Sequence, residues 1–299
     1  MKKLLVVIIV FLFLSGCNKS HENIAVQYRE RDRYIFSEDN YFGAHLILEY
    51  EVHREKKRYI VEDEKELALL IYYHYLNHEK VTEFIIRGGK YNIDYIYLYV
   101  YTLIPDRFML YQSNQDNYST IELELMTEFD MEELSRVSDE ILSNIPKNAS
   151  DREKVKYIHD HIIRTAEYDN LAINDLSGGR LYNDASHPYA IIINKKGLCV
   201  GYSMAMNYLL DKLSIPSIMV MSYADNHVWN LIYIEDTWYQ LDATWNDPIP
   251  DVRNRIIYTY FLKPAASGYF VDHKYDKLSD YTLDLQAYLE FGNWLLDIE

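Results

Sequence analysis

The order of apolar and polar residues predicts a mixture of helices and strands in the first half of the chain. A strand is expected from Phe42 to Glu51. Ile93 to Leu103 and Thr120 to Thr127 alternate in the two-residue period of a strand. Glu64 to Asn77 instead carries apolar residues at helical spacing. These elements define an N-terminal α/β region over residues 41–148, in which no constellation of cysteine, histidine and acidic residues is present.

Two further helices are predicted between residues 131 and 168. The first runs from Met131 to Ser143 and is ended by Pro146. The second begins at the capping box Ser150-Asp151-Arg152-Glu153, in which the serine and the glutamate satisfy each other's backbone N–H groups, and it ends near Tyr168. A looser segment then covers residues 170–188.

A cysteine lies at the start of the next predicted helix. Tyr202, Met206, Leu209 and Leu213 recur at three- to four-residue spacing, so the helix begins at or next to Cys199. Unpaired N–H groups and the positive end of the helix dipole favour a thiolate at this position.

Three strands follow this helix, and the hairpin between the last two sets their register. They are expected over Ser217 to Tyr223, His227 to Ile234 and Thr237 to Asp242. A two-residue loop, Glu235 and Asp236, places Trp229 opposite Asp242. Because side chains alternate between the faces of a strand, His227 and Asp242 share one face as diagonal neighbours. At a backbone separation of roughly 7–8 Å, a carboxylate reaches an imidazole N–H.

The N-terminus carries an export signal. Lys2 and Lys3 precede an apolar run from Leu4 to Leu14, which is shorter than the about 20 residues that a bilayer requires. Residues 1–16 are therefore predicted to be a signal peptide. The sequence Leu14-Ser15-Gly16-Cys17 resembles a bacterial lipobox, which implies cleavage before Cys17 and lipid attachment to its thiol. An ordinary secretory signal with a chance cysteine is the alternative.

The composition limits which partners the protein can bind and how it can attach to a membrane. The 299-residue chain has a formal net charge of −16, so a nucleic-acid partner, which requires a basic surface, is not expected. An acidic body gains nothing from anionic lipid headgroups, so the membrane must be reached through acyl chains at Cys17. Residues 17–40 are polar and charged and are expected to form a lipidated tether on the extracytoplasmic side of the cell membrane.

The cysteine count makes Cys199 a candidate reactive group. The chain has two cysteines, and commitment of Cys17 to lipid leaves Cys199 without a disulfide partner. A lone cysteine is either a small buried hydrophobic residue or a reactive thiol. The position of Cys199 at a helix start favours the reactive thiol.

Cys199, His227 and Asp242 suit nucleophilic attack on an amide. Asp242 would orient one imidazole nitrogen and favour the imidazolium, while the other nitrogen takes or shares the thiol proton. The thiolate would form a thioester, and water or a second amine would resolve it. The Cys199 backbone N–H would hold part of the oxyanion, with no second donor predicted. This chemistry requires no metal or organic cofactor.

Three ordered motifs carry a resemblance to a known superfamily. Gly197-Leu198-Cys199-Val200-Gly201-Tyr202, His227-Val-Trp-Asn230 and Trp238-Tyr-Gln-Leu-Asp242-Ala-Thr-Trp-Asn-Asp-Pro248 resemble the transglutaminase-like core of bacterial envelope proteins, a superfamily related to papain-like peptidases. The resemblance covers residues 150–265. It implies that Cys199, His227 and Asp242 form the triad, and that Tyr168 and Tyr202 line the site. The sequence departs from many relatives at Val200, where they carry Gln.

The resemblance implies an α+β fold with a papain-like core in a catalytic domain over residues 149–299. A helix bearing the cysteine would pack on an antiparallel sheet bearing His and Asp. The implied function is that of an exported, lipid-anchored peptidase or amidase acting on protein or cell-wall peptide. A protein-crosslinking transglutaminase and a non-enzymatic surface module with this fold are the alternatives.

Other residues have weaker claims to a function. Trp229 is a candidate for stacking on substrate, although core packing is the usual role of a buried tryptophan. His74 and His78 have a spacing that could ligate a metal, but without a third ligand they are interpreted as solvated. His159 either lines the site or is structural, and Asn246 and Asp247 are assigned to a turn without a catalytic role.

Overall fold

The computed structural model describes 28–35, 45–53, 56–104, 108–115, 118–125, 129–172, 184–222, 225–247, 249–250, 252, 255–265, 267, 270, 272–273 and 285–297. The predicted signal peptide, Cys17 and the tether as far as residue 27 lie outside these residues. Among the helices within these ranges, none combines the length and the apolar character that crossing a bilayer requires.

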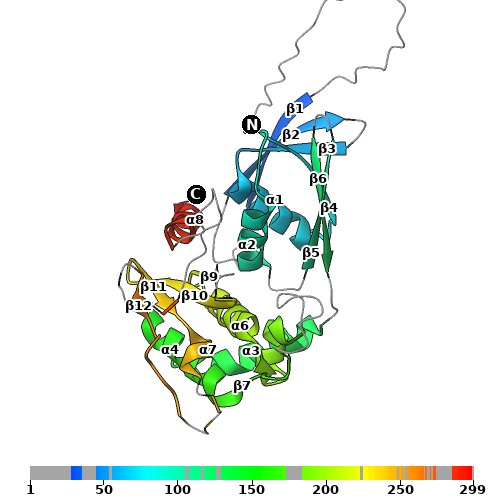
Figure 1. The fold of residues 1–299 in the computed structure, drawn as a ribbon. Helices are drawn as coiled ribbons and strands as arrows, with labels where there is room; N and C mark the ends of the chain where they lie inside the picture. The colour runs from blue at the N-terminus through cyan, green and yellow to red at the C-terminus, as the bar shows by residue number, and fades with distance from the viewer. Residues whose placement is uncertain are drawn as a thin grey trace, which may run out of the picture.

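The N-terminal region is a six-stranded sheet covered by two helices. In chain order its elements are β1 (Tyr28–Ile35), β2 (His45–His53), β3 (Lys56–Val61), α1 (Glu64–Leu76), β4 (Val81–Ile86), α2 (Ile93–Leu103), β5 (Phe108–Asn114) and β6 (Ser119–Leu125). The strand order is β1-β2-β3-β4-β6-β5, antiparallel except for the parallel pair β3–β4. Helix α1 packs on the sheet and α2 packs on α1 (Figure 1).

Two predictions for this region are wrong. Ile93 to Leu103 forms helix α2 and not a strand. Nearly every residue there is apolar or aromatic, so a two-residue and a helical period are both present. The tertiary structure buries Ile96, Tyr99, Val100 and Leu103 at helical spacing, and Tyr101 beside them. The predicted tether also extends too far, because β1 falls within residues 17–40 and pairs with β2. Strands β3, β4 and β5 were not predicted.

The remaining helix predictions for the first 170 residues are confirmed. Helix α1 begins after Asp63, whose side chain accepts from the backbone N–H groups of Lys65 and Glu66. Helices α3 (Met131–Ser143) and α4 (Asp151–Thr165) lie where the sequence placed them, and both halves of the Ser150–Glu153 capping box are present.

The second half of the chain contains the helix and the sheet predicted for the chemistry. Its elements after α4 are β7 (Glu167–Tyr168), a 3₁₀ turn (Asp184–Ser186), α5 (Pro188–Ile192), β8 (Lys196–Gly197), α6 (Cys199–Asp211), β9 (Ser217–Ser222), β10 (His227–Ile234), β11 (Thr237–Leu241), α7 (Ala243–Asn246), β12 (Lys263–Pro264) and α8 (Leu285–Asp297). The antiparallel sheet has the order β12-β11-β10-β9. The α+β fold is thus as predicted, with the cysteine helix packed on the sheet.

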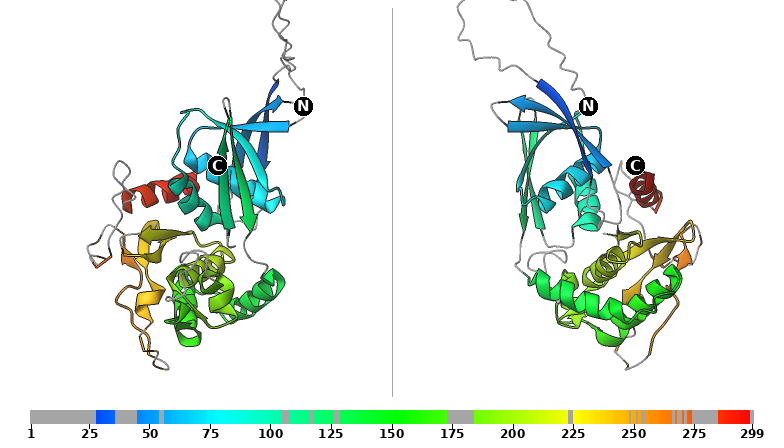
Figure 2. Two further views of the ribbon diagram at one scale, coloured as in Figure 1. Left: turned by 45° about the vertical axis from the view of Figure 1, so that its right-hand side comes forward. Right: turned by 180° about the vertical axis from the view of Figure 1, so that it is seen from behind.

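Two hydrophobic cores include residues of this sheet. One joins α3, α4, α5 and α6 to residues such as Ile232 and Leu241. The other joins α1 and α2 of the N-terminal region to β9, α8 and Cys199 itself. Figure 2 shows the N-terminal sheet at one end of the molecule and the second half at the other, with α8 beside the junction.

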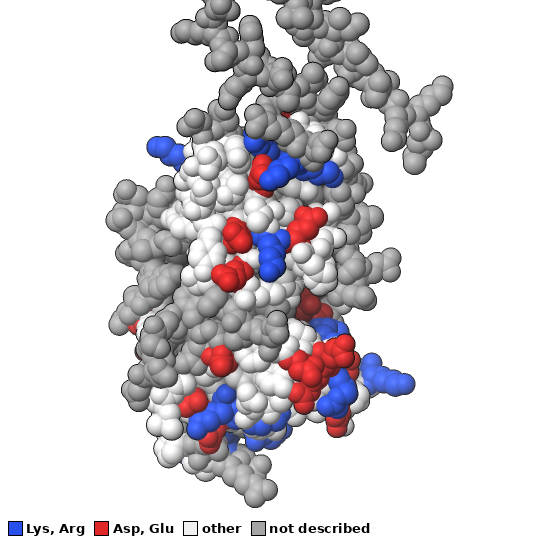
Figure 3. Space-filling view, turned by 90° about the vertical axis from the view of Figure 1, so that its right-hand side faces the viewer, with Lys and Arg blue, Asp and Glu red and all other residues white. Residues whose placement is uncertain are grey.

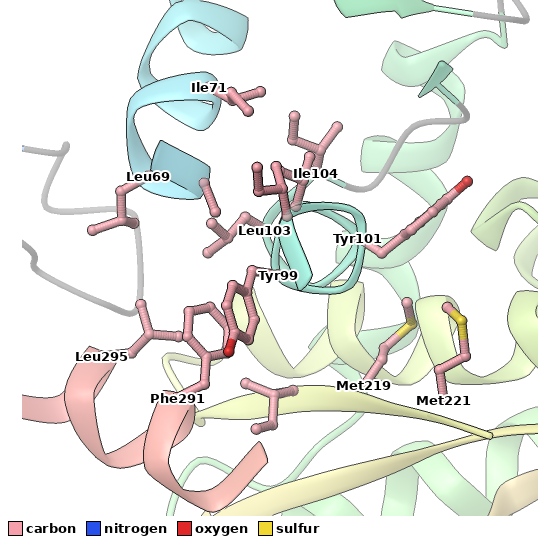
Figure 4. Close-up of a cluster of buried hydrophobic side chains, with 14 of the residues drawn as sticks. Leu69, Ile71, Tyr99, Tyr101, Leu103, Ile104, Met219, Met221, Phe291 and Leu295 are labelled. Carbon is pink, nitrogen blue, oxygen red and sulfur yellow. The ribbon is translucent and has the colours of Figure 1, made fainter. Parts of the chain in front are cut away.

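Helix α8 closes the junction between the two halves. Tyr99 of α2 stacks on Phe291 of α8 with ring centroids 4.0 Å apart. Met219 and Met221 of β9 belong to the same buried cluster (Figure 4). Local patterns in the sequence predict no contact of this kind, because each partner comes from a different part of the chain. The N-terminal region is therefore packed directly on the sheet that carries the candidate histidine.

Surface charges are mixed on the side of the molecule drawn in Figure 3. Acidic and basic side chains of the described residues are interspersed there. The Arg58–Glu83 ion pair, at 3.1 Å, joins the neighbouring strands β3 and β4, and the Arg87–Glu49 pair, at 2.9 Å, joins the residue after β4 to β2.

Candidate active site

Two glycines set the position of the cysteine helix. A Cβ at Gly197 would lie 2.7 Å from the Ala185 carbonyl oxygen, and one at Gly201 would lie 2.6 Å from the same atom. The backbone of the 3₁₀ turn therefore approaches both sides of the α6 N-terminus more closely than a side chain permits. Leu198 also donates its backbone N–H to Ala185 at 2.8 Å. As a result Cys199 is held as the first residue of α6, where backbone N–H groups have no helical acceptor.

The hairpin brings the histidine and the aspartate together as its register predicts. Ile234 pairs with Thr237 and Asn230 with Leu241, which places Trp229 opposite Asp242. His227 Nε2 lies 2.6 Å from Asp242 Oδ2. The carboxylate is fully buried and also caps α7, since its Oδ1 accepts from the Trp245 backbone N–H at 2.9 Å.

The side chain of Cys199 interacts with His227 and contributes to the raised pKa of the histidine. Because Nε2 contacts the aspartate, Nδ1 is the nitrogen available to the thiol. Burial lowers the pKa of His227, but the Asp242 charge, the hydrogen bond to Asp242 and the contact with Cys199 together raise it to about 10. Burial raises the pKa of Asp242, while the charge and the hydrogen bond of His227 lower it to about 2, with a smaller contribution from His273. The arrangement therefore favours an imidazolium beside an ionised carboxylate.

A second histidine, His273, contacts the same carboxylate oxygen. Its Nε2 lies 2.8 Å from Asp242 Oδ2, and its side chain is fully buried. The sequence interpretation missed this residue. Residues 266–284 contain no periodic pattern, and a lone histidine there carries no signal of its own.

His227, Asp242 and His273 are the described residues that could be considered for a metal, with candidate ligand atoms within 4.8 Å of one another. Their two nitrogen–oxygen distances are 2.6 and 2.8 Å. Two ligands of one tetrahedral zinc ion, each about 2.0–2.1 Å from it, lie roughly 3.3 Å apart. The observed distances are those of hydrogen bonds.

The three residues predicted to contact substrate occupy different environments. Tyr202 and Trp229 are fully buried, with the Tyr202 hydroxyl bonded to Asp247 and Trp229 Nε1 donating to Gln240 at 3.0 Å. Neither presents surface to a substrate in this structure, and Trp229 packs against His227 with centroids 5.8 Å apart. Tyr168, in β7, is half-buried and pairs with Gly197. Their role in substrate binding stays a prediction.

His159 joins α4 to α7. Its Nδ1 lies 3.0 Å from Asp160 Oδ1 and its Nε2 3.0 Å from Asn246 Nδ2, and the ring is fully buried. Asn246 Oδ1 also accepts from the Tyr260 backbone N–H at 2.9 Å. His159 is therefore structural, and Asn246 stabilises the segment that follows Asp242.

The interpretation of His74 as a solvated residue is wrong. His74 is buried, and its Nδ1 lies 3.0 Å from Thr82 Oγ1 and 3.3 Å from Glu79. His78 is exposed and turns the chain after α1 with a φ of 57°. The two side chains thus lie in different environments and do not form a solvated pair.

Comparison with known proteins identifies the part of the chain that holds this site. Residues 136–243 match the sequence profile of the Transglutaminase-like superfamily. The human Kyphoscoliosis peptidase is 25% identical over 159 residues, which is 46% of this chain and 23% of that protein. The mouse protein of the same name is 25% identical over 158 residues, 45% of this chain and 23% of that protein. The chain thus spans about a quarter of the length of these curated relatives.

Solved structures with some likeness include a crystal structure described as that of a TGase. It is 14% identical, with a TM-score of 0.35, and the match covers 69% of this chain and 68% of that chain. The periplasmic domain of TgpA from Pseudomonas aeruginosa is 15% identical, with a TM-score of 0.23, covering 43% and 53%. Cys199, His227 and Asp242 all fall within the residues that match the sequence profile. The part of the chain that holds the three candidate residues, residues 136–243, is therefore similar to the Transglutaminase-like superfamily.

Proposed function

We propose that this protein is a thiol hydrolase that cleaves amide bonds in protein or cell-wall peptide through a thioester. The observation that carries the proposal is the hydrogen bond between His227 and the buried Asp242, at 2.6 Å, with the Cys199 thiol at the first residue of a helix and interacting with the same histidine. The matched human and mouse proteins are named as peptidases, which is in keeping with this reaction.

Cys199, His227 and Asp242 take different parts in the reaction. The Cys199 thiolate attacks the amide carbonyl carbon and forms a C–S bond, while the backbone N–H groups of the first turn of α6 stabilise the oxyanion. The C–N bond breaks as His227 Nδ1 gives its proton to the leaving amine. Water then adds to the thioester and passes a proton to His227, and cleavage of the C–S bond restores the thiolate. Asp242 keeps the imidazole in the correct tautomer throughout.

Alkylation of the thiol by iodoacetamide, followed against pH, tests this proposal. A free cysteine thiol has a pKa of about 8.5. Wild-type Cys199 is expected to react well below that pH, because His227 stabilises the thiolate. His227→Ala should react only as the pH approaches about 8.5. Asp242→Asn should lie between them, since an amide can still bond to the ring but can hold the wrong tautomer. Cys199→Ser is the blank.

If wild type and His227→Ala give the same profile with a midpoint near 8.5, the thiol is not activated, and the fold would serve binding alone. An amide-mimicking electrophilic probe on the same four proteins then reports acylation. Incorporation of an added amine in place of water would assign transamidation and exclude simple hydrolysis.

We also propose that the protein is exported and anchored to the extracytoplasmic side of the cell membrane through lipid on Cys17. The support is the charged start, the apolar run from Leu4 to Leu14 and the lipobox-like sequence that ends at Cys17. Cys17→Ala should abolish fatty-acid labelling and processing, because the thiol is the attachment point. Labelling and membrane fractionation that are unchanged in the variant would refute the anchor.

A further inference from the structure

One oxygen of the candidate aspartate accepts from two imidazoles. His227 Nε2 lies 2.6 Å and His273 Nε2 lies 2.8 Å from Asp242 Oδ2. The carboxylate is ionised, since the pKa of Asp242 is lowered to about 2, so both nitrogens must carry a proton and donate. The Trp245 backbone N–H occupies the other oxygen. The orientation of the carboxylate is therefore defined by three donors, of which His227 is only one.

Among the described residues, His273 has one polar partner, Asp242, and otherwise lies in an aromatic cage. Its ring centroid lies 4.0 Å from that of Trp245, 4.5 Å from Phe270, 4.7 Å from Trp229 and 5.2 Å from Tyr260. The side chain is fully buried, and its Nδ1 has no hydrogen-bond partner among the described residues.

Burying an imidazole with one unpaired nitrogen is unfavourable by comparison with burying an apolar ring. The cage is aromatic on all the sides named above, so phenylalanine would fill it without that penalty. What phenylalanine cannot supply is the N–H that reaches Asp242. The contact with the carboxylate is therefore the feature that distinguishes histidine from an apolar residue at this position.

We propose that His273 is a positioning residue of the candidate site, which holds Asp242 Oδ2 in line with His227 and thereby keeps the imidazole directed at Cys199. It acts through Asp242 and touches no reacting atom. This inference rests on the proposed function, since it assigns His273 to the machinery that activates the thiol. Titratable groups around the ring among the described residues are His227, Asp242 and Tyr260, whose hydroxyl donates to Asp272 at 3.1 Å.

Two substitutions separate positioning from packing. His273→Phe fills the cage but removes the donor, and His273→Gln keeps an N–H₂ donor at similar reach while packing less well. Positioning predicts that His273→Gln stays within about threefold of wild type in alkylation rate at pH 6, whereas His273→Phe falls about tenfold or more, because misplacement of a supporting group by a fraction of an ångström weakens the pair it orients. A packing role predicts the reverse order. KM for any substrate should be unchanged in both.

Proton NMR supplies a readout that does not depend on activity. Imidazole N–H groups bonded to a buried carboxylate should appear as far-downfield, slowly exchanging signals, and wild type is expected to show two. His273→Phe should remove one signal and shift the other, which belongs to His227, while Cys199→Ser should retain both. Two signals in His273→Phe, or an alkylation rate in His273→Phe equal to wild type, would overturn the proposal.

The two hypotheses fail in different ways. If wild type shows no activated thiol but two downfield signals of which His273→Phe removes one and shifts the other, the proposed function fails and the hydrogen-bond arrangement stands. If wild type is activated and His273→Phe is equally reactive, only the role of His273 is refuted. Circular dichroism and the Tm of both variants identify any loss of folding, and His273→Gln is then compared alone.

Discussion

At the scale of single residues, the candidate site depends on close approaches that leave no room for a side chain. Gly197 lies two residues before Cys199 and Gly201 two residues after it, and both face the Ala185 carbonyl oxygen. The motif Gly-Leu-Cys-Val-Gly is therefore explained by geometry as well as by resemblance. Glycine is required because a Cβ would collide with backbone, which cannot rotate away as the end of a flexible side chain can.

Gly201→Ala is expected to destabilise the protein by about 1–3 kcal/mol and to displace the start of α6. The introduced Cβ would lie 2.6 Å from the Ala185 carbonyl oxygen. The matched control is Gly88→Ala, because a Cβ there would lie 4.0 Å from the nearest atom and its φ is not in the left-handed region. Urea denaturation measures both. Equal free energies of unfolding for the two variants would show that the turn moves aside at no cost.

At the scale of elements, the outer edge of β9 is covered by helices. The Met219 backbone N–H donates to Thr102 Oγ1 of α2 at 3.3 Å. Tyr288 of α8 accepts from the Met221 N–H at 2.9 Å and donates to the Met221 carbonyl at 2.7 Å. An edge strand presents unpaired backbone N–H and C=O groups. Here side chains of α2 and α8 bond to those of Met219 and Met221. Cys199 is only 1% exposed in this closed arrangement.

Tyr288→Phe is expected to weaken the attachment of α8 and so to make the thiol easier to reach. Loss of the hydroxyl leaves the Met221 N–H and carbonyl unpaired, at a cost of about 1–3 kcal/mol. The Cys199 alkylation rate should rise at constant pH, since access requires local opening. Tyr91→Phe serves as the control, because its hydroxyl donates to Asn114 at the surface. A rate that does not change in Tyr288→Phe would mean that access to Cys199 opens elsewhere.

At the scale of the whole molecule, the buried charges couple stability to pH. The pKa of His227 is raised to about 10, so its contribution is complete below the unfolded value of about 6.5 and is lost as the pH rises through about 10. The pKa of Asp242 is lowered to about 2, so its contribution is present above about 4 and is lost as the pH falls toward 2. Together these groups favour the folded state most between about pH 4 and 6.5.

The Tm difference between wild type and His227→Gln should therefore shrink as the pH rises from about 6.5 to 10. Glutamine preserves a hydrogen bond to Asp242 but has no proton to lose, so subtracting the two curves removes the titration of all other groups. Calorimetry or circular dichroism across this range provides the comparison. A difference that stays constant with pH would show that His227 is neutral in the folded protein over the whole range.

The features that could be predicted are those decided by interactions close in the chain. His227 and Asp242 are 15 residues apart and are joined by a two-residue turn, so alternation and register alone brought them onto one face. The position of Cys199 at a helix start followed from the apolar stripe after it. Local pattern was misleading at Ile93 to Leu103, because a segment that is apolar at almost every position fits a strand and a helix alike.

Contacts between residues far apart in the sequence could not be inferred in this way. His273 reaches Asp242 across 31 residues, and Tyr288 reaches Met221 across 67. Each of these contacts requires the chain to return to a surface already formed, and no spacing rule connects the partners. The sequence alone therefore indicated the residues for thiol chemistry. The contact of His273 with Asp242 and the covering of the edge of β9 depend on the tertiary structure, because a hydrogen bond between distant segments forms only when their surfaces meet.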